Sequence, residues 1–293
     1  MKLSANLPEQ ELKPDYPLSG LTTMKIGGNA RYFLVPATQE ELIRSILRLT
    51  KEGIPYVVLG RGSNILICDD VIPAAVIKLG EGFRCINPVS SYVCAVGAAT
   101  ALATVLRYCI ENRLGGLEMF AGIPATIGGL ACMNASCFKR DFLSLVEEVR
   151  VIDRKGKEHS LSRNVIRYGY RKSNLDRFII TEVVLKFKPE ENVKKNIAAF
   201  LAQRIATQDF RFPSLGCIFK NPPGYSAGAL IDECGLKGLR IGDAAVSDIH
   251  ANFIVNHGHA RAGEVDQLIK TIKDKVWDKF KIMLSEEIRR WGC

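Results

Sequence analysis

The order of the helical and strand-like patterns most constrains how this chain can fold. Residues 38–53 predict an amphipathic helix, because Thr38 suits its N-cap, Glu41 follows three residues later and Gly53 suits its end. Four apolar segments typical of strands precede the next helical pattern, which covers 101–116; they are 54–60, 64–70, 74–80 and 92–98. A doubly wound fold alternates strands and helices regularly. This chain does not, and we therefore expect an α+β fold in two units.

The second half of the chain predicts a hairpin, a strand and two helices. Residues 146–162 predict a hairpin that turns at 153–156, and 177–189 predict a long strand. Helical periodicity follows over 193–206 and again over 262–280. The residues expected to be buried on these two helices are Val193, Ile197, Phe200, Leu201 and Ile205 on the first, and Val265, Leu268, Ile269, Ile272 and Val276 on the second.

A polar stretch at 189–192 suggests the main domain boundary, near residue 190. The chain is then divided into a flexible N-terminal arm over 1–20, a first domain over 21–190 and a second domain over 191–293.

The cysteine, histidine and charge content limits the classes of protein this chain can be. Its nine cysteines form no C-x-x-C pair and its four histidines have no metal-ligand spacing, so we expect reduced thiols and no metal site. It has no N-terminal apolar signal region and no run of 18 apolar residues, which indicates a cytoplasmic protein without membrane insertion. A net charge of +9 suits dinucleotides, nucleotide sugars or nucleic acid. The basic residues are scattered, however, and carry no RNA-binding signature.

The sequence "LGRGSN" (59–64) follows an apolar strand pattern and is a candidate phosphate-binding loop. Gly60 and Gly62 permit unusual backbone angles, and the amides around Ser63 and Asn64 suit a nest for an anion. The loop differs from a Walker loop, because no Gly-Lys-Ser/Thr follows, and from a dinucleotide fingerprint, because Ile65 replaces the third glycine. A plain turn between two strands is the alternative.

Two further stretches contain small or basic residues that suit a bound ligand. "GIPATIGGLACMNAS" (122–136) is rich in glycine and alanine, which suits either close approach to a flat ring or tight helix–sheet packing. "RYGYRKS" (167–173) contains Arg167, Arg171 and Lys172, which suit a carboxylate or phosphate ligand, or simply an exposed basic loop.

The sequence "PSLGCIFKNP" (213–222) raises the question of what Cys217 does. It is either a buried apolar thiol or an acid in a reaction, and no neighbouring base indicates a nucleophile. "LSEEI" (284–288) supplies Glu286 and Glu287, and alternation along a short strand does not tell which of them points inward.

Taken together and in this order, the motifs resemble the UDP-N-acetylenolpyruvoylglucosamine reductase family of flavoenzymes in its compact form, without the extra substrate-covering insertion. The resemblance implies an FAD-binding domain of the vanillyl-alcohol-oxidase (PCMH) type, made of two α+β lobes, and a C-terminal α+β substrate domain. The motifs that carry it span residues 22–288; they are "TTMKIGG", "LGRGSNIL", "GLEMFAGIPATIGG", "MNAS", "YGYRKS", "GCIFKNP", "GALIDECGLKGLRIGDAAVSDIHANFIVN" and "LSEEI".

The resemblance also implies the residues that hold cofactor and substrate. Arg171, Cys217 and Glu287 match the family's catalytic residues. Lys220 and Asn221 are candidates for contact with the UDP moiety. The positions that match its FAD-binding segments are Gly60, Arg61, Gly62, Ser63 and Asn64 in the first, and Gly122, Ile123, Pro124, Thr126 and Gly128 in the second.

The implied reaction converts UDP-N-acetylglucosamine enolpyruvate to UDP-N-acetylmuramate, a step of peptidoglycan synthesis, with non-covalent FAD as cofactor and NADPH as co-substrate. Hydride passes from reduced FAD to C3 of the enolpyruvyl group, and C2 is protonated. Arg171 then stabilises the charge on the substrate carboxylate, with help from Glu287, and Cys217 supplies the proton. Serine usually stands at the position of Cys217 in this family, and glycine at those of Ala125 and Ser136.

The sequence is also compatible with other functions. Another FAD-dependent oxidoreductase of the same fold could act on a small alcohol or sugar, a non-catalytic nucleotide-binding protein could keep the fold, and the charge permits nucleic-acid binding. The sequence indicates no obligate protein partner and does not reveal the oligomeric state.

Overall fold

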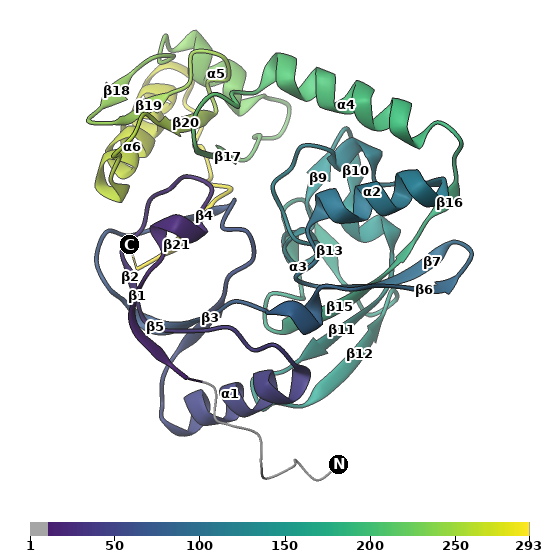
Figure 1. Cartoon of the computed structure of the whole chain (residues 1–293). Coiled ribbons are helices and arrows are strands. Elements are labelled where there is room, and N and C mark those ends of the chain that lie inside the picture. Colours follow the sequence, from purple (N-terminus) through teal and green to yellow (C-terminus); the bar gives the residue numbers. More distant parts are fainter. Residues whose placement is uncertain (1–10, 293) are drawn as a thin grey trace. The chain divides into compact units, whose positions relative to one another are not determined.

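The chain forms two units, each assembled from separate stretches of sequence. The computed structural model describes residues 11–292 (Figure 1). In this range the first unit consists of 11–14, 32–60 and 74–202, and the second consists of 15–31, 61–73 and 203–292. The chain therefore passes from one unit to the other several times, once between Gly60 and Arg61.

The largest sheet of the first unit is antiparallel and has the strand order β12-β11-β15-β7-β6. Helix α3 packs against β7 and β15, on the same sheet (Figure 1). The bounds are β6 Ile86–Ser90, β7 Val93–Gly97, β11 Val146–Ile152, β12 Glu158–Ser162, β15 Ile179–Lys186, α2 Leu102–Asn112 and α3 Ile127–Met133.

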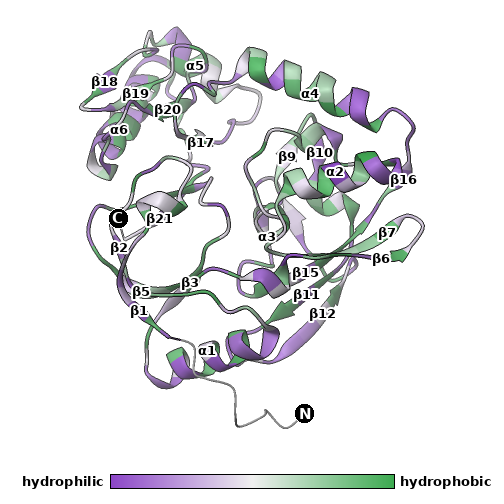
Figure 2. Ribbon diagram, in the orientation of Figure 1, coloured by the Kyte–Doolittle hydropathy of each residue, from purple (hydrophilic) through white to green (hydrophobic). Residues whose placement is uncertain are grey.

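A four-stranded sheet has the order β1-β2-β5-β3, and its β3–β5 pairing is parallel and lies within the first unit. Helix α1 follows β2, and Thr38 caps it by accepting a hydrogen bond from the Glu41 main chain (3.2 Å). Hydrophobic and hydrophilic residues alternate around α1 (Figure 2). The bounds are β1 Lys13–Pro17, β2 Asn29–Leu34, β3 Tyr56–Val58, β5 Ile72–Ile77 and α1 Gln39–Lys51.

The second unit contains the sheet β17-β20-β19-β18, with helix α6 packed against β18 and β19 (Figure 1). A parallel pair, β21 and β4, lies in the same unit. The bounds are β4 Ile65–Ile67, β17 Ser214–Cys217, β18 Arg240–Ile241, β19 Ala244–Val246, β20 Phe253–Asn256, β21 Arg289–Trp291, α5 Ala227–Glu233 and α6 Ala262–Phe280.

The remaining elements are short or connect larger ones. The two-stranded pairs are β8 Leu114–Gly115 with β16 Lys188–Pro189, β9 Ser136–Cys137 with β10 Arg140–Asp141, and β13 Tyr168–Gly169 with β14 Lys172–Ser173. The 3-10 helices are η1 Ser19–Leu21, η2 Glu81–Phe83, η3 Glu118–Phe120 and η4 Phe142–Leu145, and helix α4 covers Val193–Thr207.

Several predicted elements are confirmed. Helix α6 has the predicted bounds, and all five residues of its predicted stripe are at most 2% exposed. The predicted hairpin is β11–β12, with Gly156 donating a turn hydrogen bond to the Asp153 carbonyl (3.0 Å). Gly53 adopts φ +65° just after α1, as a helix-ending glycine does.

Two helix predictions are partly wrong. Helix α2 stops at Asn112 because Arg113 adopts a left-handed φ of 53° and the next two residues pair with β16. On α4 the predicted stripe fails at Ile205, which is 57% exposed. Arg204 is 8% exposed instead and donates to the Gln208 side chain (3.3 Å), so its neighbour on the helix turns outward.

The prediction of a flexible N-terminal arm is wrong for the part of the arm that the structure describes. Residues 11–20 include strand β1 and the start of η1, whereas residues 1–10 lie outside the described range. The division at residues 20 and 190 remains a prediction. Within 11–292, no helix combines the length and hydrophobicity needed to cross a bilayer.

Candidate active site

The start of helix α3 brings two predicted FAD-binding positions of the first unit together. Thr126 caps α3 by accepting a hydrogen bond from the Gly129 main chain (3.3 Å). A Cβ atom added to Gly60 would lie 3.0 Å from Thr126 Oγ1. The absence of a side chain at Gly60 thus lets the end of the β3 segment approach the N-terminus of α3. The first amides of α3 are already used within the protein, since Ile127 donates to the Thr100 carbonyl (3.0 Å).

In the second predicted segment, glycine suits positions 122 and 128 for different structural reasons. Gly122 has φ +85°, a left-handed angle that a glycine adopts without strain. The Gly128 amide donates to the Ala98 carbonyl (2.9 Å), and a Cβ on Gly128 would lie 2.8 Å from the Ala98 Cβ. Gly128 therefore meets the packing requirement between α3 and β7, which was the alternative explanation for this stretch.

Ala125 and Ser136, which stand where the family usually has glycine, are compatible with this backbone. Neither residue adopts a positive φ, so a side chain adds no left-handed strain at either position. The Ala125 amide donates to the Ile123 carbonyl (2.9 Å) and its carbonyl accepts from Leu102 (3.0 Å).

Arg171 is held by the segment that contains Ser136. Its Nη1 donates to the Ser136 carbonyl (2.8 Å), and its guanidinium carbon lies 5.2 Å from the centre of the Tyr170 ring. Arg171 has φ +56°, an angle that costs a non-glycine residue energy and persists only where surrounding contacts enforce it.

Two further hydrogen bonds enforce this conformation by joining "MNAS" to "YGYRKS". Asn134, which is fully buried, donates from Nδ2 to the Gly169 carbonyl (2.9 Å). Ser173 donates from Oγ to the Cys132 carbonyl (2.8 Å). The basic loop is therefore attached to the end of α3 on both sides of Arg171, which presents its guanidinium in a fixed direction.

In the second unit, the loop after Gly60 is held by the N-terminal motif "TTMKIGG". Gly62 has φ +65°, and a Cβ there would lie 2.6 Å from the Leu21 carbonyl oxygen. The Thr23 amide donates to the Gly62 carbonyl (3.1 Å), and its hydroxyl donates to the Ser214 carbonyl (2.7 Å) at the start of β17. Thr23 thus connects the loop to the strand that ends at Cys217.

This loop has the donors that a phosphate requires. Among residues 11–292, the main-chain N–H groups of Arg61, Gly62 and Ser63 have no protein acceptor. Successive unpaired amides in a turn form an anion-binding concavity, so these residues fit the pyrophosphate of a dinucleotide cofactor. Asn64 is used differently, because its Nδ2 donates to the Glu287 carbonyl (3.2 Å).

Cys217 and Glu287 lie on neighbouring segments of the second unit. Cys217 ends β17 and is paired with Phe253 of β20. The amide of Glu287 donates to the carbonyl of Ile218 (2.7 Å), and Phe219 forms an antiparallel bridge with Glu286. The structure therefore places two of the three predicted catalytic residues close together along paired backbones.

The structure also distinguishes the two glutamates of "LSEEI". Glu286 forms ion pairs with Lys273 and, at 2.7 Å, with Arg290 Nε. Although burial opposes the shift, hydrogen bonds from Arg290 and Lys273 hold the pKa of Glu286 below its usual range. Glu286 is thus held as an ion-paired carboxylate, and the assignment of Glu287 as the catalytic glutamate stays a prediction.

The two predicted substrate-contact residues, Asn221 and Lys220, make different hydrogen bonds within the protein. Asn221 accepts a hydrogen bond from the Ala227 amide (2.9 Å) at the start of α5, so its Oδ1 is engaged and its Nδ2 is the group suited to a ligand. Lys220 donates from its main chain to the Ser285 carbonyl (2.8 Å), which fixes its backbone.

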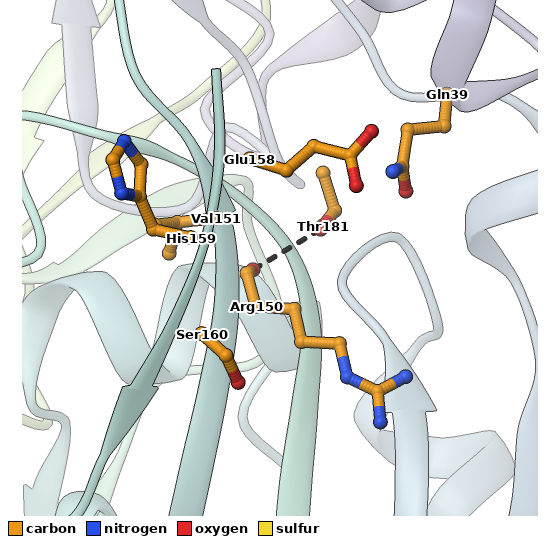
Figure 3. A pocket seen from close by; sticks show the side chains of 7 residues that line it. All are labelled: Gln39, Arg150, Val151, Glu158, His159, Ser160 and Thr181. Carbon is orange, nitrogen blue, oxygen red and sulfur yellow. Dashed lines mark hydrogen bonds between the residues drawn. The ribbon is translucent and has the colours of Figure 1, made fainter. Parts of the chain in front are cut away.

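A cavity of about 170 Å³ in the first unit contains none of the predicted site residues (Figure 3). Two of its lining residues already make polar contacts, since Arg150 pairs with Glu182 (2.6 Å) and His159 with Asp153 (2.8 Å). The residues that line it are Gln39, Arg150, Val151, Glu158, His159, Ser160 and Thr181.

Comparison with known proteins defines the class of the chain. Residues 30–162 match the family model described as "FAD binding domain". Residues 208–291 match the model described as "UDP-N-acetylenolpyruvoylglucosamine reductase, C-terminal domain". Together with the α+β fold and the glycine loop, these matches define an FAD-dependent oxidoreductase.

Full-length relatives identify the family. The UDP-N-acetylenolpyruvoylglucosamine reductase of Syntrophobacter fumaroxidans is 37% identical over 291 residues, which cover 97% of this chain and 84% of the relative. That of Nitrosomonas eutropha is 35% identical and covers 99% of this chain and 91% of the relative. The crystal structure of UDP-N-acetylenolpyruvylglucosamine reductase (MurB) from Thermus caldophilus is 38% identical, with a TM-score of 0.84 over 97% of this chain and 100% of that chain. The chain belongs to the UDP-N-acetylenolpyruvoylglucosamine reductase family.

The predicted fold class, FAD cofactor and family are thereby confirmed, and the roles of individual residues remain predictions. The sequence did not reveal Thr23, Asn134 or Asn252, which hold the candidate site through hydrogen bonds. All three lie in motifs that carried the resemblance, but nothing in a single sequence indicates which backbone groups a buried side chain will contact.

Proposed function

We propose that the protein reduces UDP-N-acetylglucosamine enolpyruvate to UDP-N-acetylmuramate, with NADPH as the source of electrons. The observation that carries this proposal is the match to named reductases over nearly the whole chain. Because the substrates are a nucleotide sugar and a nicotinamide cofactor, we place the reaction in the cytoplasm.

We assign the FAD-binding residues to two segments. When bound by these residues, FAD would supply the transfer of hydride from NADPH to C3 of the enolpyruvyl group. The unpaired amides of Arg61, Gly62 and Ser63 support the assignment of the first segment. The proposed set is Gly60, Arg61, Gly62, Ser63 and Asn64, with Gly122, Ile123, Pro124, Thr126 and Gly128.

Arg171 is proposed to bind the substrate carboxylate. Negative charge moves into this carboxylate as C3 gains hydride, and a guanidinium already fixed in place stabilises that charge without reorganisation. The contacts that fix Arg171, from Ser136 and Tyr170, support this role. Glu287 is proposed to share the task by hydrogen bonding.

Cys217 is proposed to protonate C2. A thiol has a free pKa of about 8.5, so at pH 7 it is mostly protonated and is a stronger acid than a serine hydroxyl. The Sγ–H bond breaks as the C2–H bond forms, and the negative charge passes from the substrate to the thiolate. Lys220 and Asn221 are proposed to contact the UDP moiety.

The test is an anaerobic visible spectrum of the FAD-loaded protein. NADPH should bleach the flavin, and UDP-N-acetylglucosamine enolpyruvate should then restore its colour. Bleaching without recovery would reject the proposed substrate. Recovery with a simple alcohol or sugar would favour the other oxidoreductase function, against which the match of 208–291 to the reductase C-terminal domain argues.

A further inference from the structure

We propose that Asn252 is a positioning residue, which fixes the Cys217 segment against the Glu287 segment. The proposal rests on the function proposed above, because it assigns Asn252 a role in delivering the proton from Cys217. Asn252 itself does not contact the reacting atoms; it acts through the backbone of the two residues that follow Cys217.

The side chain of Asn252 substitutes for a neighbouring strand. It is 3% exposed, and its Nδ2 donates to the Phe219 carbonyl (2.8 Å) while its Oδ1 accepts from the Phe219 amide (2.9 Å). The Asn252 carbonyl also accepts from the Ile218 amide (2.9 Å). One residue thus satisfies three of the four main-chain hydrogen-bonding groups of Ile218 and Phe219.

The fourth group connects this segment to Glu287. The Ile218 carbonyl accepts from the Glu287 amide (2.7 Å), and the next amide, of Lys220, donates to the Ser285 carbonyl (2.8 Å). The backbone after Cys217 is therefore bonded to Asn252 on one side and to the Glu287 segment on the other. A change at Asn252 shifts Cys217 relative to Glu287.

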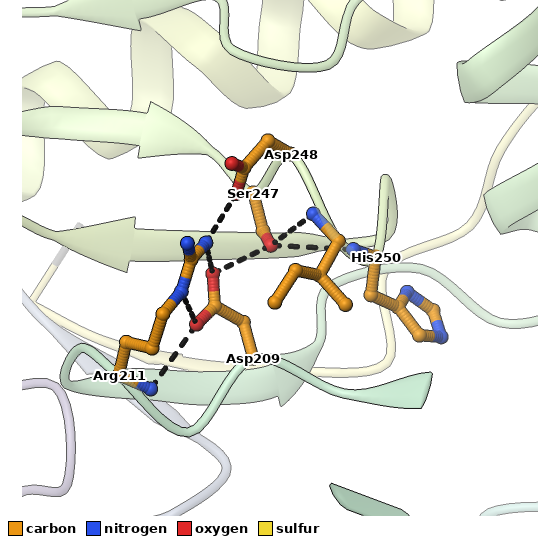
Figure 4. A network of polar contacts seen from close by, with 6 residues as sticks. Asp209, Arg211, Ser247, Asp248 and His250 are labelled. Atoms are coloured by element: carbon orange, nitrogen blue, oxygen red, sulfur yellow. Dashed lines mark hydrogen bonds and ion pairs between the residues drawn. The ribbon is translucent and has the colours of Figure 1, made fainter. Parts of the chain in front are cut away.

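Asn252 is in turn attached to a polar network that precedes both β17 and β20 (Figure 4). Its amide donates to His250 Nδ1 (3.2 Å), and the His250 amide donates to Ser247 Oγ (3.2 Å). Ser247 donates to the buried carboxylate of Asp209 (2.8 Å), which also binds Arg211. The network keeps the residues before each strand in place, so Asn252 has a fixed base from which to hold Phe219.

A fixed base matters because proton transfer depends strongly on position. A displacement of about 1 Å from a residue outside the chemistry can slow an enzyme by about 10²-fold. Phe219 is 1% exposed, so no water replaces a hydrogen bond that Asn252 stops making. Its backbone must then move or remain unsatisfied.

Asn252→Asp tests the role with almost no change in volume. An ionised carboxylate accepts from the Phe219 amide but cannot donate to the Phe219 carbonyl, and two oxygens then face each other. We expect flavin reduction by NADPH within about twofold of wild type and flavin reoxidation by substrate slowed by about 10²-fold at pH 8. Protonation restores the donor, so the reoxidation rate of the variant should approach that of wild type as the pH falls.

Asn256→Asp is the matched control. Asn256 is 2% exposed, ends β20, and uses its side-chain amide in the same way, donating to Met24 and accepting from Gly258 and Ala260. It makes no side-chain hydrogen bond to 217–220 or 285–287 among the described residues. Its substitution should lower the melting temperature but leave the ratio of reoxidation to reduction rates unchanged.

The outcomes separate the two proposals. If substrate does not reoxidise the wild-type flavin, the proposed function fails and the positioning role fails with it. If the wild-type flavin is reoxidised normally, two results would overturn the positioning role alone. The Asn252→Asp variant could keep the wild-type ratio of reoxidation to reduction rates, or both rates could fall together, as in a protein that is only destabilised. If Asn252→Asp does not fold at pH 8, its reduction and reoxidation rates are measured at pH 6 and compared with those of Asn252→Ser. The ratio of the two rates is then judged by the same criteria.

Discussion

In the first unit, Arg171 itself stands on a left-handed backbone, whereas in the second unit Cys217 ends strand β17 and Glu287 follows the bridge between Phe219 and Glu286. The guanidinium of Arg171 donates to the Ser136 carbonyl, and hydrogen bonds made by Asn134 and Ser173 hold the backbone on either side of Arg171. The Cys217 segment is fixed through its own backbone by Asn252 and Glu287. The guanidinium is thus presented by a left-handed backbone, and the proposed proton donor by hydrogen bonds to the backbone that follows it.

This difference fits what each group is proposed to do. A guanidinium that stabilises developing charge must be oriented before the reaction, and an enforced backbone angle orients it at a cost of about 1–3 kcal/mol. A proton donor must lie at the right distance from one carbon atom, and the spacing between paired backbones sets such a distance. Substitutions in the two regions should therefore have different signatures.

Arg171→Ala should have the largest effect in the first unit. Loss of the guanidinium should slow flavin reoxidation by substrate by roughly 10²–10³-fold, because a preorganised charge-stabilising group is removed. Flavin reduction by NADPH, followed by absorbance, should be unchanged. Arg171→Lys keeps the charge but not the two-pronged geometry and should recover only part of the loss. Equal loss in both half-reactions would contradict the assignment.

Gly62→Ala should weaken FAD binding and stability in the second unit. The left-handed angle alone costs roughly 1–3 kcal/mol for a side chain, and the new Cβ would lie 2.6 Å from the Leu21 carbonyl oxygen. Gly53→Ala is the matched control, because Gly53 has the same φ of +65° but nothing within 4 Å of an added Cβ.

Thermal unfolding and bound-flavin absorbance measure the difference between the two glycine variants. Both should lose stability from the backbone angle, and only Gly62→Ala should also lose FAD. Equal behaviour of the two variants would show that the contact with Leu21 does not shape the loop.

The pH dependence of reoxidation sharpens the comparison further. With Cys217 as donor, the rate should fall as the pH rises through the thiol pKa, by about tenfold per unit above it, because the thiolate has no proton to give. Cys217→Ser should keep much of the activity and lose this fall, since a hydroxyl does not ionise in the range. A wild-type profile flat to about pH 10 would argue against the thiol.

Acid stability should show the smallest effect, through Asp209 in the second unit. Hydrogen bonds, above all from Arg211, lower the pKa of Asp209 from 3.8 to about 2. The folded protein thus binds this proton less readily than the unfolded chain, so the stabilisation is complete above pH 3.8 and is lost as the pH falls towards 2. Asp209→Asn should reduce the dependence of unfolding on pH in that window, measured by urea titration, whereas an unchanged slope would contradict it.

The sequence predicted the elements with strong periodicity and missed those without it. Helix α6 could be located to the residue because five apolar side chains mark one face. No bounds were predicted for helix α3, because its small residues form no apolar stripe; the sequence offered tight helix–sheet packing only as an alternative, and Gly128 does let the helix approach Ala98.

The candidate site could be predicted only as far as its motifs. Periodicity does not distinguish Glu286 from Glu287, and the ion pairs of Glu286 with Lys273 and Arg290 form only in the folded chain. Asn252 likewise forms its bonds with a residue 33 positions away, a contact that only the folded chain creates.

The central claim, that Cys217 donates the proton, is tested most directly by separating the half-reactions of Cys217→Ala in the FAD-loaded protein. Flavin reduction by NADPH should proceed at the wild-type rate. Reoxidation by UDP-N-acetylglucosamine enolpyruvate should slow by roughly 10²–10⁴-fold, the usual contribution of a general acid. Normal reoxidation of the alanine variant would show that the proton comes from elsewhere.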